Sequence, residues 1–192
     1  VLDASDHVYL YITMRRGGKN IYALDVTDQQ SPELLWVIKG GEGSYTELAQ
    51  TWSTVTLGKV MHSGAEKKVL IFGGGYDEDQ DDAAVTTEDD EGRTIYIADA
   101  VTGDRLWTAG ADAVTPTANM NFSIPARITT LDISGSGFTD RLYAVDMGGQ
   151  LFRFDIDNSN NSALSSNIIG GRIADLADAS KPFADRTKAN AR

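Results

Sequence analysis

The sequence lacks cysteine, and it has only two histidines, His7 and His62, among its 192 residues. Without cysteine the chain has no disulfide, no zinc–thiolate site and no cysteine nucleophile. The two histidines are far apart in the sequence, and we expect each to be an ordinary polar or half-buried side chain. These shortages exclude several common kinds of metal and catalytic site, although they do not fix the cellular compartment.

Basic residues are also few, since 17 Lys and Arg stand against 28 Asp and Glu and give a net charge of −11. A surface this acidic repels phosphate backbones and anionic lipids, so we expect no nucleic-acid or membrane-surface binding. Purely apolar runs are short, such as Val69–Phe72, so no membrane-spanning segment is expected. No basic stretch followed by an apolar one marks a signal peptide. We expect the chain to be a fragment of a longer protein.

Short segments rich in Val, Ile, Tyr, Phe, Thr and Trp recur along the chain, each bounded by Gly, Asp, Asn or Ser. This composition is typical of β-strands, and no long segment before residue 160 shows a helical apolar period. The sequence therefore predicts an all-β fold. The expected strands are His7–Thr13, Asn20–Asp25, Leu34–Ile38, Ser53–Lys59, Lys68–Gly73, Thr94–Asp99, Arg105–Ala109, Ile124–Asp132, Arg141–Asp146, Gln150–Asp155 and Gly170–Ala177.

The segments also repeat. Ile21–Asp25 matches Ile95–Asp99, each is followed by a polar turn and a strand that ends near a tryptophan, and Gln150–Asp155 holds the same place in a third copy. A unit of four strands that then repeats along the chain favours tandem blades of a β-propeller. We expect Trp36, Trp52 and Trp107 to pack blade on blade. A β-sandwich of about ten strands is the alternative, but a sandwich does not require the internal repeat that this sequence has.

The repeat divides the single predicted domain, residues 1–192, into about three four-stranded antiparallel blades. A partial first blade covers 6–40, the second 51–110 and the third 121–177, and 178–192 is a tail or the start of a further blade. Because a closed ring needs more blades, the chain is predicted to be part of a propeller.

An acidic insertion, residues 77–91, separates the second and third strands of the second blade and has no basic residue. Its composition predicts an exposed, mobile loop. Asp77, Asp79 and Asp81 have alternating spacing that could hold a second cation, but the glycine that would permit a sharp turn is missing. The basic stretch Arg15–Lys19 predicts a hairpin turn, with contact to an anion or an acidic partner as the alternative.

The segment LDISGSGFTDRLY, residues 131–143, carries most of the ligand pattern of a calcium loop. Asp132, Ser134, Ser136 and Asp140 occupy relative positions 1, 3, 5 and 9, and Gly137 at position 6 permits the curl. Phe138 at position 7 would add its backbone carbonyl. Tyr143 stands where an EF-hand has its glutamate, so this is not an EF-hand. With two carboxylates we expect weak Ca²⁺ binding, and a hairpin whose Asp side chains bond their own backbone is the alternative.

Several stretches together resemble the C-terminal domain of the PilC/PilY type IV pilus-associated proteins. They are Met14–Asp25, Gln50–Thr54, Leu70–Asp77, Asp140–Tyr143 and Gly148–Asp155. The resemblance implies a modified, quinoprotein-like β-propeller with a calcium loop between two strands. Asp132 and Asp140 match the ends of that loop, whereas Ser134 and Ser136 stand where Asp or Asn is more usual.

The same resemblance implies a non-enzymatic factor at the pilus tip or outer membrane. Its partners would be pilus components such as minor pilins, together with a host or abiotic surface. Its roles would be pilus assembly, the balance of extension and retraction, twitching motility and adhesion. One alternative is a quinone-dependent dehydrogenase, because Asp99–Trp107 has the look of a quinoprotein blade motif, although such motifs report architecture rather than chemistry. The other is a propeller that serves as an outer-membrane assembly scaffold.

Overall fold

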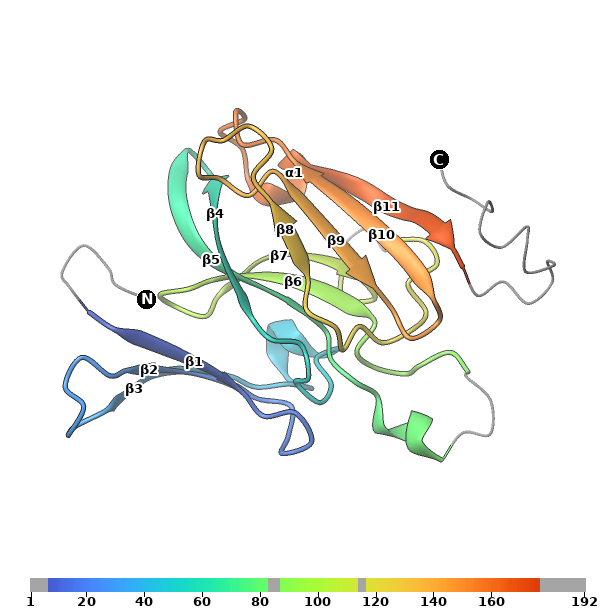
Figure 1. Ribbon diagram of the computed structural model, residues 1–192, viewed down its shortest axis with the longest axis horizontal. Coiled ribbons are helices and arrows are strands. Elements are labelled where there is room, and N and C mark those ends of the chain that lie inside the picture. Colours follow the sequence, from blue (N-terminus) through green and yellow to red (C-terminus); the bar gives the residue numbers. More distant parts are fainter. Residues whose placement is uncertain (1–6, 83–86, 114–116, 177–192) are drawn as a thin grey trace.

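The computed structural model describes residues 7–82, 87–113 and 117–176, and these fold almost entirely as β-structure (Figure 1). The elements, in chain order, are β1 (Tyr9–Thr13), β2 (Ile21–Asp25), β3 (Glu33–Ile38), the 3-10 helix η1 (Gly43–Tyr45), β4 (Thr56–His62), β5 (Ala65–Gly73), the 3-10 helix η2 (Glu78–Asp81), β6 (Thr94–Asp99), β7 (Arg105–Gly110), β8 (Thr129–Leu131), β9 (Arg141–Val145), β10 (Gln150–Ile156), α1 (Leu164–Asn167) and β11 (Ile168–Asp175). The all-β prediction is confirmed. In the described part of the chain, no helix is long and apolar enough to cross a membrane.

The strands form three separate antiparallel sheets, each running in sequence order from one edge to the other. The described residues give the first sheet three strands, β1-β2-β3, and the other two four strands each, β4-β5-β6-β7 and β8-β9-β10-β11. Figure 1 shows them as successive layers, with β4–β7 between the other two. Stacked meanders of this kind are the blades of a propeller, whereas the alternative β-sandwich would have two sheets.

The internal repeat extends to the irregularities of the ladders. The pairing of β2 with β3 shifts register between Ala23 and Leu24, and that of β6 with β7 shifts between Ile97 and Ala98. These are equivalent positions of the two matching segments. A bulge bends the strand locally and increases its twist, so the two sheets share a curvature as well as a sequence pattern.

Two apolar cores lie on the two sides of the middle sheet. On one side Leu70 and Phe72 join Ile21 of the first sheet, and on the other Val69 and Ile71 join the third sheet. The run Val69–Phe72 is therefore apolar at every position because both faces of β5 are buried. The outer sheets are buried on one face, which is why Leu10 and Ile12 on β1 remain 45% and 36% exposed.

Two of the three tryptophans join one sheet to the next, as predicted. The ring of Trp36 on β3 packs against Gly103, in the turn between β6 and β7. The contact leaves no room for a side chain, because a Cβ at Gly103 would lie 2.9 Å from the ring, and the φ of Gly103 is +76°. Trp107 on β7 meets Phe154 on β10 edge-on, with ring centroids 5.3 Å apart. Trp52 instead lies beneath the guanidinium of Arg15 and meets Tyr76 edge-on, and both of these residues lie outside the strands of the sheets.

Two strand predictions need correction. The expected strand Ile124–Asp132 is reduced to β8, and Ile124 forms only an isolated bridge with Gly75. Pro125 explains the interruption, because it has no N–H to donate to a ladder. The first strand of the middle sheet begins at Thr56 rather than Ser53, since the Ser53 hydroxyl is used to bond the backbone of Gly73 and Ala126. Residue 177 and the tail 178–192 lie outside the described residues.

The acidic insertion is more ordered than its composition predicted. Asp77 and Asp89 are only 3% and 2% exposed. The carboxylate of Asp77 accepts from the backbone N–H groups of Asp79, Asp90 and Glu91 and so ties the two ends of the insertion together. Composition alone misses this, because an Asp that bonds nearby backbone builds a turn rather than a solvated coil. Residues 83–86 lie outside the described part.

Candidate metal centre

The loop Asp132–Asp140 joins β8 to β9, between two adjacent strands of the third sheet, as the sequence predicted. Asp132 follows the last residue of β8, and Asp140 precedes the first residue of β9. The antiparallel pairing of Leu131 with Arg141 brings these two aspartates to the mouth of the loop. The equivalent link in the middle sheet is a tight turn at Ser63 and Gly64, so the longer loop belongs to the third sheet.

Asp132 organises the loop from within. Its Oδ1 accepts from the backbone N–H groups of Gly135 and Ser136, and its Oδ2 accepts from that of Gly137, at 2.7–3.1 Å. Gly137 has a φ of +83°, a conformation that favours glycine and lets the chain turn back. Since each carboxylate oxygen has about two acceptor positions, Asp132 Oδ2 retains capacity for a further ligand.

Asp140 closes the other end. Its Oδ2 accepts from the backbone N–H groups of Ile133 and Ser134, both at 2.8 Å, and its Oδ1 accepts from the Asn158 amide. Burial alone would raise the pKa of Asp140, but the bonds from Ser134 and Asn158 hold it below its usual value. The group is therefore a carboxylate at neutral pH, which a metal ligand must be.

Asn158 was not identified from the sequence. It lies between β10 and α1, and besides Asp140 it bonds the carbonyl of Thr139 and the backbone N–H of Met61. It thereby anchors the loop to β4. No local sequence signal marks it, because the tertiary fold brings it to the loop from 18 residues away.

The Ser134 hydroxyl lies between the Asp132 carboxylate and the Ser136 hydroxyl. Ser134 Oγ is 2.8 Å from Ser136 Oγ and 3.4 Å from Asp132 Oδ1. In a pentagonal bipyramid with Ca–O distances near 2.4 Å, neighbouring ligands are about 2.8 Å apart around the ring and about 3.4 Å apart between ring and axis. The oxygens are thus spaced as adjacent ligands of one ion, although hydrogen bonds have the same lengths.

The donor set fits a hard cation and no softer one. Asp132 and Asp140 supply two negative charges, Ser134 and Ser136 supply neutral oxygens, and Phe138 has a backbone carbonyl at the fifth predicted position. Calcium prefers such oxygen ligands, and waters complete its shell at an exposed loop. Among residues 7–82, 87–113 and 117–176 no group of three or more Asp, Glu, His or Cys side chains gathers as a metal site. Two carboxylates therefore limit the loop to weak binding.

One cation of the protein lies against the loop. Lys59 Nζ on β4 sits 4.4 Å from the centre of the Phe138 ring, in a cation–π contact. It also lies 3.4 Å from a carboxylate oxygen of Glu66, which offsets its charge. The backbone carbonyl of Lys59 accepts from Thr139 N–H at 2.8 Å, so the loop is fixed to β4 by backbone as well as by side chains.

Two of the three candidate ligands at the second possible cation site, Asp77 and Asp81, are used in contacts within the chain. Asp81 pairs with Arg16 at 2.7 Å, and Glu91 pairs with Lys19 at 2.5 Å. The hydrogen bonds of Asp77 go to backbone N–H groups, as described above. The basic stretch Arg15–Lys19 is a hairpin turn between β1 and β2, as predicted, and its acidic partner is the insertion of the same chain.

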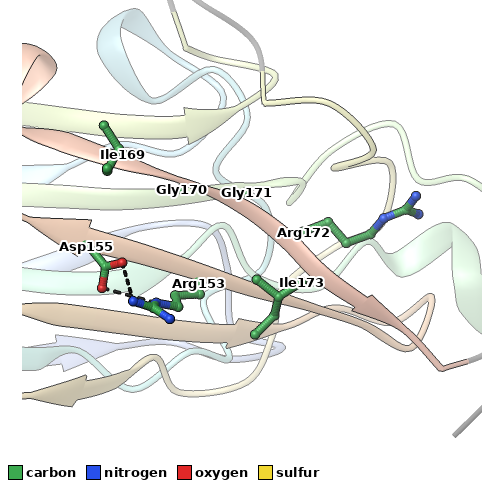
Figure 2. Close-up of a pocket in the computed structure, with 7 residues that line it drawn as sticks. All are labelled: Arg153, Asp155, Ile169, Gly170, Gly171, Arg172 and Ile173. Atoms are coloured by element: carbon green, nitrogen blue, oxygen red, sulfur yellow. Dashed lines mark hydrogen bonds and ion pairs between the residues drawn. The ribbon is translucent and has the colours of Figure 1, made fainter. Parts of the chain in front are cut away.

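A shallow pocket on β10 and β11 carries charged side chains of opposite sign (Figure 2). Arg153 and Asp155 line it and pair with each other at 2.6 Å, as the dashed lines in Figure 2 show. Asp155 also pairs with Arg141 on the neighbouring strand. The single carboxylate of Asp155 thus faces two guanidinium groups, so this part of the sheet keeps a net positive charge.

The motif Asp99–Trp107, which suggested a quinoprotein blade, is used for packing. Asp99 bonds the backbone N–H groups of Val101 and Thr102 and pairs with Lys67 at 2.8 Å, which forms the turn between β6 and β7. Gly103 then receives the ring of Trp36 from the first sheet. The motif therefore joins one sheet to the next.

Residues 1–176 match the family described as the PilY1 beta-propeller domain. The sequence is 30% identical over 166 residues to the type IV pilus biogenesis factor PilY1 of Pseudomonas aeruginosa strain UCBPP-PA14, and 32% identical over 150 residues to that of strain PAO1. The alignments cover 86% and 78% of this chain but only 13% and 11% of those relatives, so the chain spans a small part of their length.

The fold is also similar to a solved structure, the crystal structure of the Pseudomonas aeruginosa PilY1 C-terminal domain. The TM-score is 0.66 at 23% sequence identity, and the match covers 91% of this chain and 35% of that one. At this identity the likeness shows the fold, which confirms the β-propeller prediction.

Proposed function

Because the chain belongs to the family of PilY1 β-propeller domains, we propose that it is part of a type IV pilus biogenesis factor and acts there as a non-enzymatic, calcium-binding domain. The match over residues 1–176 is the observation that carries the pilus assignment. The two matched relatives are named as type IV pilus biogenesis factors.

The proposed setting is the cell surface, at the pilus tip or outer membrane. The partners would be pilus components, with minor pilins first among them, and a host or abiotic surface. The domain would serve pilus assembly, the balance between extension and retraction, twitching motility and adhesion. Its net charge of −11 supports a protein-facing role, because such a surface repels nucleic acid and anionic lipid.

The calcium part of the proposal rests on the loop between β8 and β9. The loop is shaped by the backbone hydrogen bonds of its own two aspartates, and Ser134 Oγ lies at ligand-to-ligand distances from Asp132 Oδ1 and Ser136 Oγ. Ca²⁺ would add a charge of +2 between two carboxylates and would tie β8 to β9 through side chains as well as the ladder. We propose that this stiffening is how calcium acts on the domain.

Calorimetric titration of calcium into the chain tests the loop directly. We expect a binding event with a dissociation constant of about 10⁻⁴ to 10⁻³ M, the range of extracellular calcium modules. Asp132→Ala and Asp140→Ala should each remove this event, so that each variant binds one calcium ion fewer than the unmodified chain. Asp157→Ala is the matched control, because Asp157 accepts the same kind of loop hydrogen bonds, from Ser159, outside this site. Loss of the event in the control, or a calcium stoichiometry in both loop variants equal to that of the unmodified chain, would contradict the assignment.

The pilus role is tested in the source bacterium with the parent gene. Deletion should abolish surface pili and twitching, which separates a pilus factor from a general outer-membrane scaffold. The Asp132→Ala allele should alter the number of surface pili while the Asp157→Ala allele does not. An enzyme of the quinoprotein kind would instead show a stoichiometric bound chromophore after incubation with pyrroloquinoline quinone and calcium, and that result would overturn the non-enzymatic proposal.

A further inference from the structure

A second group of oxygen side chains lies at the junction of the acidic insertion with the third sheet. Asp89, near the end of the insertion, is 2% exposed. Its Oδ2 accepts from the backbone N–H of Ser123 at 2.5 Å, and its own N–H donates to the carbonyl of Asn121. Its Oδ1 is buried and has no hydrogen-bond partner.

Asp146 reaches the same junction from the turn after β9. It is 8% exposed, and its Oδ1 accepts from the backbone N–H of Gln150 at 2.8 Å. Its Oδ2 is buried and unpartnered. Ser123 stands between the two aspartates, because its N–H bonds Asp89 and its carbonyl accepts from Met147, the residue after Asp146. Its side chain is 0% exposed and its hydroxyl also lacks a partner.

The junction is tightly packed. A Cβ at Gly148, in the turn between β9 and β10, would lie 2.2 Å from the ring of Phe122. Gly92, at the end of the insertion, has a φ of +79° and would place a Cβ 2.9 Å from that of Ser123. Three segments that are distant in the sequence therefore fix Asp89, Ser123 and Asp146 relative to one another.

Unpartnered buried carboxylates are strongly unfavourable, because a charge taken out of water needs a counter-charge or a proton. The nearby basic groups are committed elsewhere: Arg172 pairs with Asp175 at 2.9 Å, and Arg93 pairs with Glu47 at 3.0 Å. Burial, assisted by the charges of Asp175 and Asp89 and opposed by the N–H bonds of Gln150 and Gly148, raises the pKa of Asp146 to about 6.

We propose that Asp89, Ser123 and Asp146 bind a divalent cation, and that calcium occupies this site under calcium-rich conditions. Three hard oxygens without other partners lie at one junction of three segments, and two carboxylates neutralise a +2 ion. The site is separate from the loop Asp132–Asp140. It would clamp the acidic insertion of the middle sheet onto the β9–β10 turn of the third sheet, and so it goes beyond the proposed function of the loop.

The test is thermal unfolding of the chain in EDTA and in about 5 mM calcium, a concentration above the weak range of extracellular modules. The Asp132→Ala variant serves as the background, so that calcium acts at one site only. About 5 mM calcium is about 5 to 50 times a dissociation constant in that range, and the mass-action stabilisation should raise Tm by about 2 to 9 °C in this background. Asp146→Asn and Asp89→Asn should each abolish the rise.

Asp146→Asn also distinguishes a bound cation from a proton shared by the two aspartates. Its amide has the size of the carboxyl group and can donate to the unpartnered oxygen of Asp89, so we expect it to fold and to match or exceed the background in EDTA. Ser123→Ala, which removes one neutral ligand, should reduce the calcium response without abolishing it. Asp175→Asn is the matched control, a neighbouring carboxylate that is paired with Arg172, and should keep the full response.

Two results would overturn the proposal. If calcium neither raises the Tm of the Asp132→Ala variant nor gives a heat of binding in calorimetry, the unpartnered oxygens of Asp89 and Asp146 share a proton rather than a metal ion. If the response persists in both Asp146→Asn and Asp89→Asn, calcium binds elsewhere. Neither result bears on the loop, whose own titration compares Asp132→Ala with the unmodified chain.

Discussion

The substitution Ser134→Asp, which adds a carboxylate to the loop, should destabilise the chain without calcium and stabilise it with calcium. Ser134 Oγ lies 3.4 Å from Asp132 Oδ1. A charge at that position in Ser134→Asp repels the Asp132 carboxylate by about 1.2 kcal/mol at the dielectric constant of water, which applies because the loop is exposed. For a chain of this size the loss corresponds to a fall in Tm of about 2 to 5 °C in EDTA at low salt.

Calcium should more than offset this repulsion. A third carboxylate moves the ligand set from that of weak extracellular modules toward that of sensor loops, which bind at about 10⁻⁷ to 10⁻⁵ M, so we expect at least a tenfold gain in affinity. At about 100 times the variant's dissociation constant, calcium stabilises Ser134→Asp by about 2.7 kcal/mol. The unmodified chain, with tenfold weaker binding, gains about 1.4 kcal/mol at the same concentration, so the difference of about 1.3 kcal/mol just exceeds the repulsion, and a larger gain in affinity widens the margin. Ser134→Asp should therefore unfold below the unmodified chain in EDTA and above it in calcium. Thermal unfolding in both conditions, with calorimetry for the affinity, measures the reversal.

Two controls isolate the geometry. Ser134→Asn has the shape of the aspartate without its charge and should show no repulsion in EDTA. Ser159→Asp adds a charge beside Asp157 in the loop after β10, where the Ser159 hydroxyl already bonds that carboxylate at 2.6 Å. It should destabilise the chain with or without calcium. If Ser134→Asp behaves like Ser159→Asp in calcium, the loop does not gather its oxygens around an ion.

Two further predictions concern the sheets and their titration. Phe154→Ala, which removes a 3% exposed ring and its edge-on contact with Trp107, should lower the free energy of unfolding by about 3 to 5 kcal/mol in urea denaturation; a loss below about 1 kcal/mol would mean that this interface does not hold the sheets together. Hydrogen bonds from the hydroxyl and amide of Thr27, and then from His7, lower the pKa of Asp25 to about 2 from its ordinary 3.8. The stability they provide is present above pH 3.8 and is lost as the pH falls toward 2, and an NMR titration in which Thr27→Ala leaves this pKa unchanged would contradict the cause.

The fold was predictable because its signals are local and repeated. Alternating strand residues, turn formers at the ends of the strands and matching segments such as Ile21–Asp25 and Ile95–Asp99 each report on a few neighbouring residues. The loop Asp132–Asp140 was found for the same reason, since its candidate ligands are close in sequence. Pro125, read as part of a strand, was the local signal that was overlooked.

What the sequence did not predict depends on contacts between distant segments. Asn158 supports the loop from a different connection, and the group around Asp89 and Asp146 is assembled from three segments. The acidic insertion was read from its average composition, which predicts a solvated coil. Its order comes from single residues, because Asp77 bonds the backbone and Asp81 pairs with Arg16 in the turn between β1 and β2.

Strand β9 relates the two proposed calcium sites. The loop ends at Asp140, directly before β9, and Asp146 follows directly after it, so the five residues of one strand separate the sites. At about 3.4 Å per residue, β9 spans about 17 Å, roughly twice the Debye length of about 8 Å at physiological ionic strength. The charges of one site are therefore screened from the other, and any coupling must pass through the rigid strand and its ladders. Effects of variants at separate sites this far apart normally add. If calcium stabilises the unmodified chain by more than the sum of its effects at the two separate sites, the ions change how β9 lies between its neighbouring strands. If the stabilisation equals that sum, calcium secures the third sheet independently at its two ends.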